Sequence, residues 1–538
     1  MGGTAGADGP AKGRARIRSA DAVLVAATAV AAGLRFWGLG RQSFWYDEWL
    51  TARAAFGTPG DLYRYVTGQA GIPPTYFGIV WLWARAFGEG ELALRGLSAL
   101  AGVATVPVAF LAARRLGLSP AVARTVAVLV AVNPMLVWYG QEARPYSIVA
   151  LLGALSVWAL ARVLDRGELR DVRVWALVAA VTVAFHYFAA FFVAAEAVVV
   201  ALRLRSPRLG LRGLGSPGPA PEPGSWRPTG RELAATFWPA AVVLAALAPF
   251  AVRQFLRRGN HDWISGVSLP TRLGEAGRSA LIGPSFPSRG LWVAAAVVVA
   301  AAVPLLVRRG DRGERRAAAL LAGLALASVA LGLAAAVVGV DVVLGRYLIV
   351  ALVPLAVAVA AGLAAARVPC GVTVAAVAAL CGLSVTAVAG VARDPDLQRA
   401  DWNAVAAAHD AAAVPGEARL LVLNTHAVLV QPVGWYLDEA RVLGPDEEAV
   451  VEQIDVVYAR PPAKPCNFLV GMACSLLWLG TPPPEPLAGD LVLEERVELD
   501  QFFLDRYRLR HPRRAAARDV VPEAFHEHML VFVSAPAA

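Results

Sequence analysis

The chain has 538 residues, of which 57% are hydrophobic and only 17% are charged, and its mean hydropathy is +0.54. A soluble protein carries about a quarter charged residues, so this composition excludes an ordinary soluble protein and indicates one that crosses a membrane many times. The net charge of +9 does not indicate nucleic-acid binding, because the basic residues lie between the apolar runs, where membrane topology requires them.

The N-terminal segment 1–20 is small, polar and basic, and no clear cleavage site follows the apolar run behind it. We therefore expect a cytoplasmic tail and a retained first helix. Eleven runs rich in Ala, Val and Leu have roughly the length that a spanning helix needs. They cover residues 21–38, 93–113, 121–138, 146–163, 172–186, 188–203, 235–252, 291–307, 317–339, 346–366 and 371–391.

The basic loops predict the orientation of these spans. Arginines follow the second, fourth, sixth, eighth and tenth runs, and the positive-inside rule places those loops in the cytoplasm. The segment 72–88, "IPPTYFGIVWLWARAFG", opens on two prolines, carries Arg85 and would put most of the arginines outside if it crossed the membrane. We predict instead that it lies on the outer surface as an interfacial helix.

This topology divides the chain into a cytoplasmic tail, a membrane domain and an extracytoplasmic domain. Their predicted bounds are 1–20, 21–392 (with a first outer loop at 39–92, a Pro-, Gly- and Arg-rich cytoplasmic linker at 204–234 and an outer loop at 253–290) and 393–538. In the last part, a helix pattern at 401–413 alternates with strand patterns at 418–424 and 528–534, which is typical of a small soluble α/β domain. Cys466 and Cys474 of this domain could form a disulfide, and their spacing leaves the question open.

Four loops predicted to lie at the outer interface carry polar side chains. These residues are Tyr46, Asp47 and Glu48; Gln141, Glu142, Arg144 and Tyr146; His186 and Tyr187; and Arg346 and Tyr347. Taken singly, each has a plain structural interpretation, such as a solvated loop charge, an interfacial anchor or a structural histidine. Ionisable groups so close to hydrocarbon are costly to bury, and their recurrence in four loops on one face favours a functional site.

These residue types suggest a chemistry. A carboxylate accepts a proton from an attacking hydroxyl or amide, and arginines bind an anionic phosphate through paired donors. Aromatic side chains stack on a sugar face and line a groove for an alkyl chain. A substrate that combines lipid, phosphate and sugar fits all three, so the predicted reaction class is glycosyl transfer from a lipid-linked donor.

Five segments then carry a resemblance to a known family. They are "FWYDEWLTA", "PPTYFGIVWLWARAFGEGELALRGLSALAGV", "NPMLVWYGQEARPYS", "HYFAAFF" and "GRYLIVALVP", in this order between about residues 20 and 360. Together they resemble the GT-C glycosyltransferases, in the family 39-like branch of the protein O-mannosyltransferases and the lipid A aminoarabinose transferases. The resemblance implies a polytopic α-helical GT-C fold with about eleven transmembrane helices, and a polyprenyl-monophosphate sugar as donor. It also implies transfer with inversion on the extracytoplasmic face.

The same resemblance implies roles for individual residues. Asp47 would be the general base toward the acceptor, with Glu48 as its catalytic neighbour that supports positioning. Donor or acceptor binding would fall to Tyr46, Glu142, Arg144, Tyr146, His186, Tyr187, Arg346 and Tyr347, the last two holding the lipid phosphate. No metal site and no cofactor is required, although some family members are linked to a divalent metal. Ile72 stands where relatives commonly have a polar residue, which puts the nature of the acceptor in doubt.

The prediction is therefore a multi-pass cell-membrane glycosyltransferase with a cytoplasmic N-terminus and an extracytoplasmic C-terminal domain. It would move a sugar to an envelope acceptor, which could be a protein, a glycolipid or a polysaccharide; the sugar, a mannose, another hexose, a pentose or an amino sugar, stays open. One alternative is a transporter or flippase of lipid-linked sugars, which would need polar groups near the bilayer midplane, where the apolar runs suggest none. The other is a non-catalytic envelope-binding protein, in which the outer carboxylates would be dispensable.

Overall fold

The computed structural model describes residues 11–68, 71–205, 229–257, 262–414, 417–424, 430–437, 440–444, 446–461, 490–516, 519 and 529–534. Every apolar run predicted to span the membrane contains a helix. These helices are α1 (Ala11–Phe36), α5 (Glu91–Arg115), α6 (Pro120–Val132) with α7 (Pro134–Gly140), α8 (Tyr146–Arg166), α9 (Leu169–Phe185), η1 (Tyr187–Ala189) with α10 (Ala190–Arg205), α11 (Gly230–Leu256), α14 (Arg289–Arg309), α15 (Arg312–Val337), η3 (Gly345–Ala351) with α16 (Leu352–Leu363), and α17 (Cys370–Arg393).

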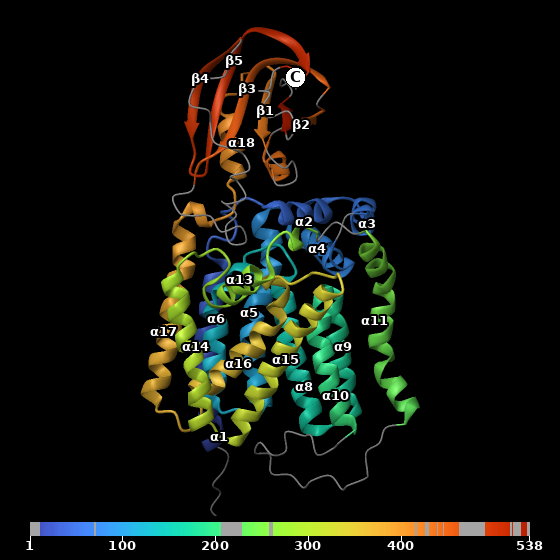
Figure 1. Ribbon diagram of the computed structural model, residues 1–538, viewed down its shortest axis with the longest axis vertical. Coiled ribbons are helices and arrows are strands. Elements are labelled where there is room, and N and C mark those ends of the chain that lie inside the picture. Colours follow the sequence, from blue (N-terminus) through green and yellow to red (C-terminus); the bar gives the residue numbers. More distant parts are fainter. Residues whose placement is uncertain are drawn as a thin grey trace, which may run out of the picture.

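The helical membrane part is confirmed, with Figure 1 showing these helices side by side. Eight helices of the described chain are long and apolar enough to cross a membrane, or nine if the pair α6 and α7 is one span bent by 54°. The bend occurs at Pro134, which has no N–H to continue the hydrogen-bond ladder of α6. The total of eleven spans stays a prediction.

Three short helices lie across one end of the bundle, beneath the C-terminal domain (Figure 1). They are α2 (Tyr46–Phe56), α3 (Pro59–Gly68) and α4 (Pro74–Phe87), with α12 (Asp262–Ser265) and α13 (Leu269–Ile282) nearby in the later chain. The α4 helix begins at two prolines and ends at Gly88, whose φ of 90° favours glycine. Arg85 donates to the carbonyls of Ala55 and Gly57 and so fixes α4 against the end of α2. The segment predicted to be interfacial thus lies across the bundle.

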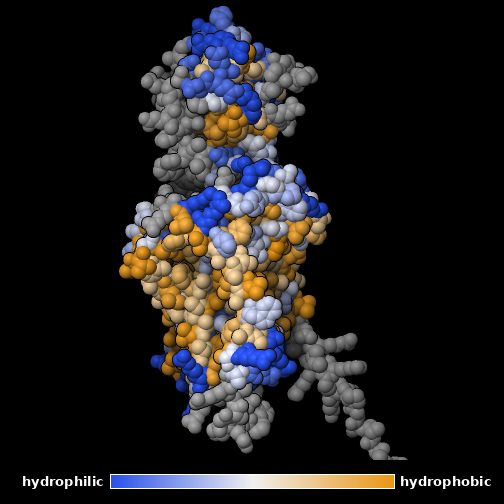
Figure 2. Space-filling model, turned by 90° about the vertical axis from the view of Figure 1, so that its right-hand side faces the viewer, coloured by the Kyte–Doolittle hydropathy of each residue, from blue (hydrophilic) through white to orange (hydrophobic). Residues whose placement is uncertain are grey.

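The basic loops gather at the opposite end. Arg115 at the end of α5 is 2.9 Å from Asp165 at the end of α8, and Arg309 at the end of α14 donates to the carbonyl of Arg367. In Figure 2, a belt of hydrophobic residues separates the bluer bands at the two ends of the helical part. This distribution is the one that the positive-inside rule predicts for a protein embedded across the belt.

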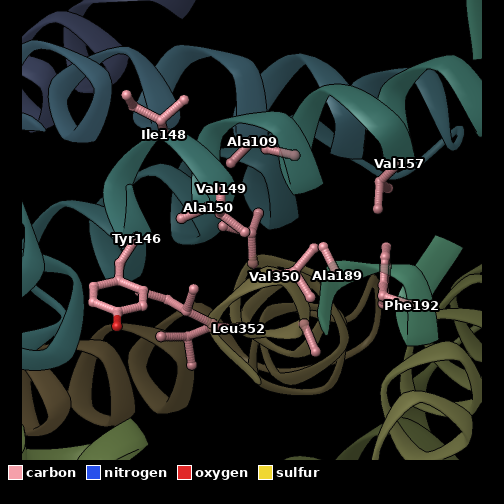
Figure 3. Packing of buried hydrophobic residues seen from close by; sticks show 14 of the residues in the cluster. Ala109, Tyr146, Ile148, Val149, Ala150, Val157, Ala189, Phe192, Val350 and Leu352 are labelled. Carbon is pink, nitrogen blue, oxygen red and sulfur yellow. The ribbon is translucent and has the colours of Figure 1, made fainter. Parts of the chain in front are cut away.

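Close packing joins α8 to η3, the segment that carries Arg346 and Tyr347. Figure 3 shows side chains of α8, among them Tyr146 and Ala150, next to Val350 and Leu352. A Cβ added at Gly153 would lie 2.7 Å from the carbonyl oxygen of Val350, a backbone atom that cannot rotate away. The absence of a side chain at Gly153 is therefore what lets η3 approach α8.

We expect Gly153→Ala to lower the free energy of unfolding by about 1–3 kcal/mol, because the added methyl overpacks a contact with backbone. The measurement is the midpoint of thermal unfolding of the purified chain in detergent. Gly323→Ala on α15 is the matched control, since nothing lies within 4 Å of its added Cβ, and its midpoint should stay or rise slightly. Equal midpoints for the two variants would show that η3 does not depend on this contact.

The C-terminal domain is a six-stranded sheet in the order β2-β6-β1-β3-β5-β4. The strands are β1 (Arg419–Asn424), β2 (Ala440–Leu443), β3 (Glu448–Ala459), β4 (Leu491–Glu498), β5 (Phe502–Ala516) and β6 (Met529–Ser534). Among the described pairings, only β1 with β3 is parallel. The predicted strands at 418–424 and 528–534 are present, as is the predicted helix, now α18 (Trp402–Asp410). Four further strands were not predicted from the sequence.

The helix α18 is fixed to the sheet by a buried polar contact. His409 lies 2.9 Å from Asp455 on β3 and 3.2 Å from Ser534 on β6, and all three side chains are buried. The soluble α/β domain is thus confirmed. Cys466 and Cys474 lie outside the described residues, so their pairing stays open.

Candidate functional site

The first turn of α2 places two carboxylates in different environments. Asp47 and Glu48 are adjacent, and successive side chains of a helix point about 100° apart, at 3.6 residues per turn. The side chain of Glu48 is 0% exposed, whereas that of Asp47 is 20% exposed. The two acids therefore cannot have the same role, and only Asp47 is open to an incoming molecule.

Glu48 is held in a buried ion pair. Arg95 of α5 donates from Nε to Oε1 at 2.8 Å and from Nη2 to Oε2 at 2.7 Å, and the backbone N–H of Ala143 donates to Oε1 at 2.8 Å. Burial acts to raise the pKa of Glu48, but the charges of Arg95 and Arg399 and the hydrogen bonds from Arg95 and Ala143 together outweigh it and lower the pKa below its ordinary value. Glu48 is thus an ionised anchor, and this geometry favours a positioning role over direct catalysis.

Arg95 also organises the turn before α2. Its guanidinium donates to the carbonyls of Leu39, Gln42 and Ser43 at 2.7–3.0 Å, while its side chain is 1% exposed. One buried cation therefore joins α5, the turn and the first turn of α2. Sequence reasoning missed Arg95, although an arginine inside a predicted span was the signal that marks such a residue.

Asp47 has Arg144 as its ionic partner. The Nη2 atom of Arg144 is 3.7 Å from Oδ2 of Asp47, and Nη1 donates to the Asp47 carbonyl at 3.4 Å. Burial acts to lower the pKa of Arg144, but Asp47 and the neighbouring tyrosines together more than offset it and raise that pKa. The structure thus brings together two residues that the sequence predicted for one site from loops about 100 positions apart.

Aromatic rings border this pair. Tyr46 stacks on Trp49 with ring centroids 5.9 Å apart, and burial together with the charge of Asp47 raises the pKa of Tyr46. Tyr65 of α3 is also affected: burial raises its pKa most, with Asp47 adding to the rise and Arg144 opposing it. Two phenol rings that stay protonated at neutral pH therefore lie near enough to Asp47 to be affected by its charge.

A second group of predicted residues meets around His186. Its ring centroid lies 5.7 Å from that of Tyr146 and 5.0 Å from that of Tyr347, and Arg346 lies 5.5 Å from the Tyr347 ring. Tyr146 links the two groups, because it follows Arg144 by two residues at the start of α8. Tyr187 is less integrated: its hydroxyl is buried and has no hydrogen-bond partner within the described chain.

Glu142 is the third carboxylate of the site and is buried beside Arg399. Its Oε2 lies 3.2 Å from Nη2 of Arg399, a residue of the segment between α17 and α18. Burial raises the pKa of Glu142 to about 7; Glu48 and Asp47 add to the rise, while Arg399 and Arg346 oppose it. Its neighbour Gln141 donates to the carbonyls of Leu34 and Trp37 at 3.1 and 2.8 Å and serves the fold.

The raised pKa of Glu142 predicts a pH-dependent stability. Between its ordinary value of 4.5 and about 7, the folded chain keeps a proton on Glu142 that the unfolded chain releases. Stability from this group therefore falls as the pH rises through that window. We expect Glu142→Gln, which cannot ionise, to gain on the order of 3 kcal/mol relative to the wild type between pH 4.5 and pH 8.

Thermal unfolding of both chains across this pH range measures the effect. The difference between the two chains isolates Glu142 from other titrating groups. A difference that does not change with pH would show that Glu142 stays ionised in the folded chain.

One apolar run carries a buried carboxyl group near its middle. The sequence predicted no polar group near the membrane midplane, and this prediction is wrong at Glu196, which lies midway along α10 and is 0% exposed. It accepts hydrogen bonds from Ser156 of α8 and from Trp175 of α9 at 3.0 Å. A single glutamate among many alanines and valines hardly changes the mean hydropathy of a run, which is why the pattern hid it.

A cavity of about 120 Å³ lies near the site without reaching Asp47. It is lined by the ends of α1, α7, α13 and α17, and Trp138 and Gln141 belong to its wall. Among the described residues, no three His, Cys, Asp or Glu side chains are grouped so as to hold a metal ion.

Residues 72–211 match the family model described as dolichyl-phosphate-mannose-protein mannosyltransferase. The resemblance to the GT-C glycosyltransferases is thereby confirmed. The matched stretch runs from the start of α4 to just beyond α10. It contains Glu142, Arg144 and His186 of the site, whereas Asp47 and Arg346 lie outside it.

Three solved structures are similar to the chain at low identity. ArnT from Cupriavidus metallidurans in the apo state has 17% identity and a TM-score of 0.40, over 63% of this chain and 59% of that one. The oligosaccharyltransferase AglB from Archaeoglobus fulgidus, in complex with an inhibitory peptide and a dolichol-phosphate, has 12% identity and a TM-score of 0.42, over 74% and 58%. ArnT bound to undecaprenyl phosphate has 14% identity and a TM-score of 0.35, over 77% and 84%.

The chain thus spans less than two thirds of the length of the first two of these structures. The comparison with curated proteins gave no match. The assignment of the GT-C type therefore rests on the family match and on the helical membrane architecture.

Proposed function

We propose that the chain is a membrane glycosyltransferase that moves a sugar from a polyprenyl-monophosphate donor to an envelope acceptor at the outer membrane interface. The observation that carries this proposal is the partly exposed Asp47 carboxylate, fixed by Arg144 beside a second, aromatic and cationic group. The family description supports the donor class, since it names a dolichyl-phosphate-linked mannose.

In the proposed reaction, Asp47 is the general base. An acceptor hydroxyl or amide attacks the anomeric carbon of the sugar, and the Asp47 carboxylate takes the proton that the acceptor loses. The new bond from the acceptor to the anomeric carbon forms as the bond from that carbon to the phosphate oxygen breaks. Because attack comes from the face opposite the leaving phosphate, the configuration at the anomeric carbon inverts.

The leaving polyprenyl phosphate needs cationic partners because it gains a negative charge. Arg346 suits this role, since it lies on η3 beside the Tyr347 ring, and its charge is near enough to lower the pKa of Glu142. Tyr146, His186 and Tyr347 then offer ring faces to the sugar or to the first isoprene unit. The proposed reaction uses neither a metal ion nor a cofactor.

The orientation belongs to the proposal as well. The basic loops lie at the end of the bundle opposite α2, and the positive-inside rule assigns that end to the cytoplasm. The site and the C-terminal domain would then face the outside, and the tail before α1 the cytoplasm. A lipid-linked donor would meet an envelope acceptor on this outer face.

A transporter gains no support from Glu196. The carboxyl group joins α8, α9 and α10 through Ser156 and Trp175, so it is explained by helix packing. The predicted site residues lie toward the end of the bundle that carries α2, which this proposal assigns to the outside.

Lipid mass spectrometry on a deletion strain tests the function. We expect one polyprenyl-phosphate sugar to accumulate in the strain and to disappear when the wild-type chain is restored, and its mass would name the sugar class. Restoration with Asp47→Asn should leave the lipid in place. A lipid pool that is the same in all three strains would contradict the proposed donor.

A further inference from the structure

The C-terminal domain contacts the segment that leads into α2. The Ser43 hydroxyl lies 3.2 Å from Oδ1 of Asp401 and accepts from the backbone N–H of Asn403 at 2.9 Å. The Tyr436 hydroxyl accepts from the backbone N–H of Phe44 and donates to Glu91, both at 2.6 Å. The residues just before Asp47 are therefore held by hydrogen bonds from the soluble domain.

One aromatic side chain of the domain touches both ends of α2. The ring centroid of Trp435 lies 6.1 Å from that of Phe44, just before the helix, and 5.3 Å from that of Phe56 at its last residue. The α2 helix thus lies between the transmembrane bundle, through Glu48 and Arg95, and the domain, through Trp435. A displacement of the domain would reach both ends of the helix that carries Asp47.

Arg399 extends from the segment that leads into the C-terminal domain and contacts residues of the site directly. It belongs to the segment between α17 and α18, and its side chain is only 2% exposed. Its guanidinium lies 3.2 Å from Glu142 and 3.6 Å from Glu48, and 4.6 Å from the Trp138 ring. One cation supplied by the domain linker thus lies between two buried carboxylates of the membrane domain.

Each of the two carboxylates links Arg399 to Asp47 by a different route. Glu48 is the next residue after Asp47 on α2, and Glu142 lies two residues before Arg144, the ionic partner of Asp47. Removing one partner from a buried charge network leaves the others uncompensated, so they must shift or take up protons. A shift of either carboxylate would move Asp47 or its partner.

We infer that Arg399 is a positioning residue for Asp47, and that through it the C-terminal domain is a constituent of the active site. The inference rests on the proposed function, since it assigns the domain a part in the same reaction. The inference predicts that Arg399→Ala increases the mobility of the first turn of α2 and of the loop 141–145 while both domains stay folded. A displacement of about 1 Å in such a site lowers turnover by about 100-fold.

The kinetic test uses the full-length chain in liposomes, with the lipid extract of the deletion strain as the donor source. We expect Arg399→Ala to lower kcat per folded molecule by 10- to 100-fold, with the half-saturating amount of extract changing less than threefold. Arg399→Lys, which keeps a cation, should recover part of the loss. Arg393→Ala is the control, since Arg393 is an exposed arginine near the other end of the same linker.

If Arg399 only stabilised the fold, Arg399→Ala would lower the yield of folded protein and the unfolding midpoint. Its kcat per folded molecule would then equal that of the wild type, and this result would overturn the inference. An Arg399→Lys variant no better than Arg399→Ala would also contradict it, because the charge would then be irrelevant.

A second readout does not depend on the reaction. Hydrogen exchange should increase in peptides covering 43–50 and 141–147 of Arg399→Ala and stay unchanged in Arg393→Ala. Unchanged exchange in Arg399→Ala would overturn the inference even if the chain transfers sugar. Increased exchange in a chain whose wild type leaves the lipid pool untouched would instead uphold the coupling and reject the transferase.

Discussion

Asp47→Asn is expected to lower the turnover number of sugar transfer by about 10²–10⁴-fold, the range that a general base contributes. The amide that replaces the carboxylate cannot accept the acceptor's proton at neutral pH. Arg144 can still donate to the backbone carbonyl of residue 47, as it does in the wild type at 3.4 Å, so the local structure should persist. The measurement is the initial rate of transfer in liposomes that contain the lipid extract of the deletion strain.

The unfolding midpoint and the half-saturating amount of donor should change little in this variant, because Asp47 faces the acceptor in the proposed scheme. Glu89→Gln is the matched control: Glu89 is an exposed carboxylate of the loop between α4 and α5, in the same layer of short helices. A rate for Asp47→Asn within a few-fold of that control would remove Asp47 from the mechanism. A loss of rate shared by both variants would point to the outer charge of the layer in general.

Much of the membrane architecture could be predicted because hydropathy and loop charge act locally. Each apolar run contains a helix, and the segment with prolines at 73 and 74 and with Arg85, predicted to be a surface helix, forms the 14-residue α4. The C-terminal sheet was harder. Strands β3 and β5 carry charged residues such as Asp455 and Arg506, which pair with each other inside the sheet and interrupt the apolar pattern of a buried strand.

The site was predictable in part for a similar reason. Polar residues of the outer loops stand out against apolar surroundings, so Asp47, Arg144 and His186 could be found from the sequence. Arg95 was missed although an arginine inside a predicted span is a signal of such a residue. Arg399 could not be found, because a single arginine in a linker has a plain explanation until its partner is known. Their partners are about 47 and 350 residues away in the chain, and only the fold brings them to Glu48.

The different environments of Asp47 and Glu48 could also be seen only in the structure. Adjacent acids look equivalent in a sequence, and only the resemblance assigned Asp47 as the base and Glu48 as a neighbour that supports positioning. Helix geometry turns one of them toward Arg95 and the other toward the open side of the layer. The pair thus combines an anchor with the proposed base, and the anchor sets the orientation of the first turn of α2.

Arg95→Met is expected to lower the free energy of unfolding by about 3–5 kcal/mol, because it leaves Glu48 buried without its closest cation. The side chains of both partners are at most 1% exposed, so water cannot replace the lost contacts. The measurement is the thermal unfolding midpoint in detergent, where we expect a fall of several degrees. Arg64→Met is the matched control, since the Arg64–Asp61 pair on α3 is exposed and its loss should leave the midpoint unchanged.

The double variant Glu48→Leu with Arg95→Met separates the charge from the packing. It removes both members of the ion pair and fills part of the space with apolar atoms, so it should be more stable than Arg95→Met alone. The double variant should still lose transfer activity, because the first turn of α2 loses its anchor in the bundle and the backbone N–H of Ala143 loses its acceptor. Stability regained together with full activity would show that Asp47 is positioned without Glu48, and that Arg144 alone suffices to hold it.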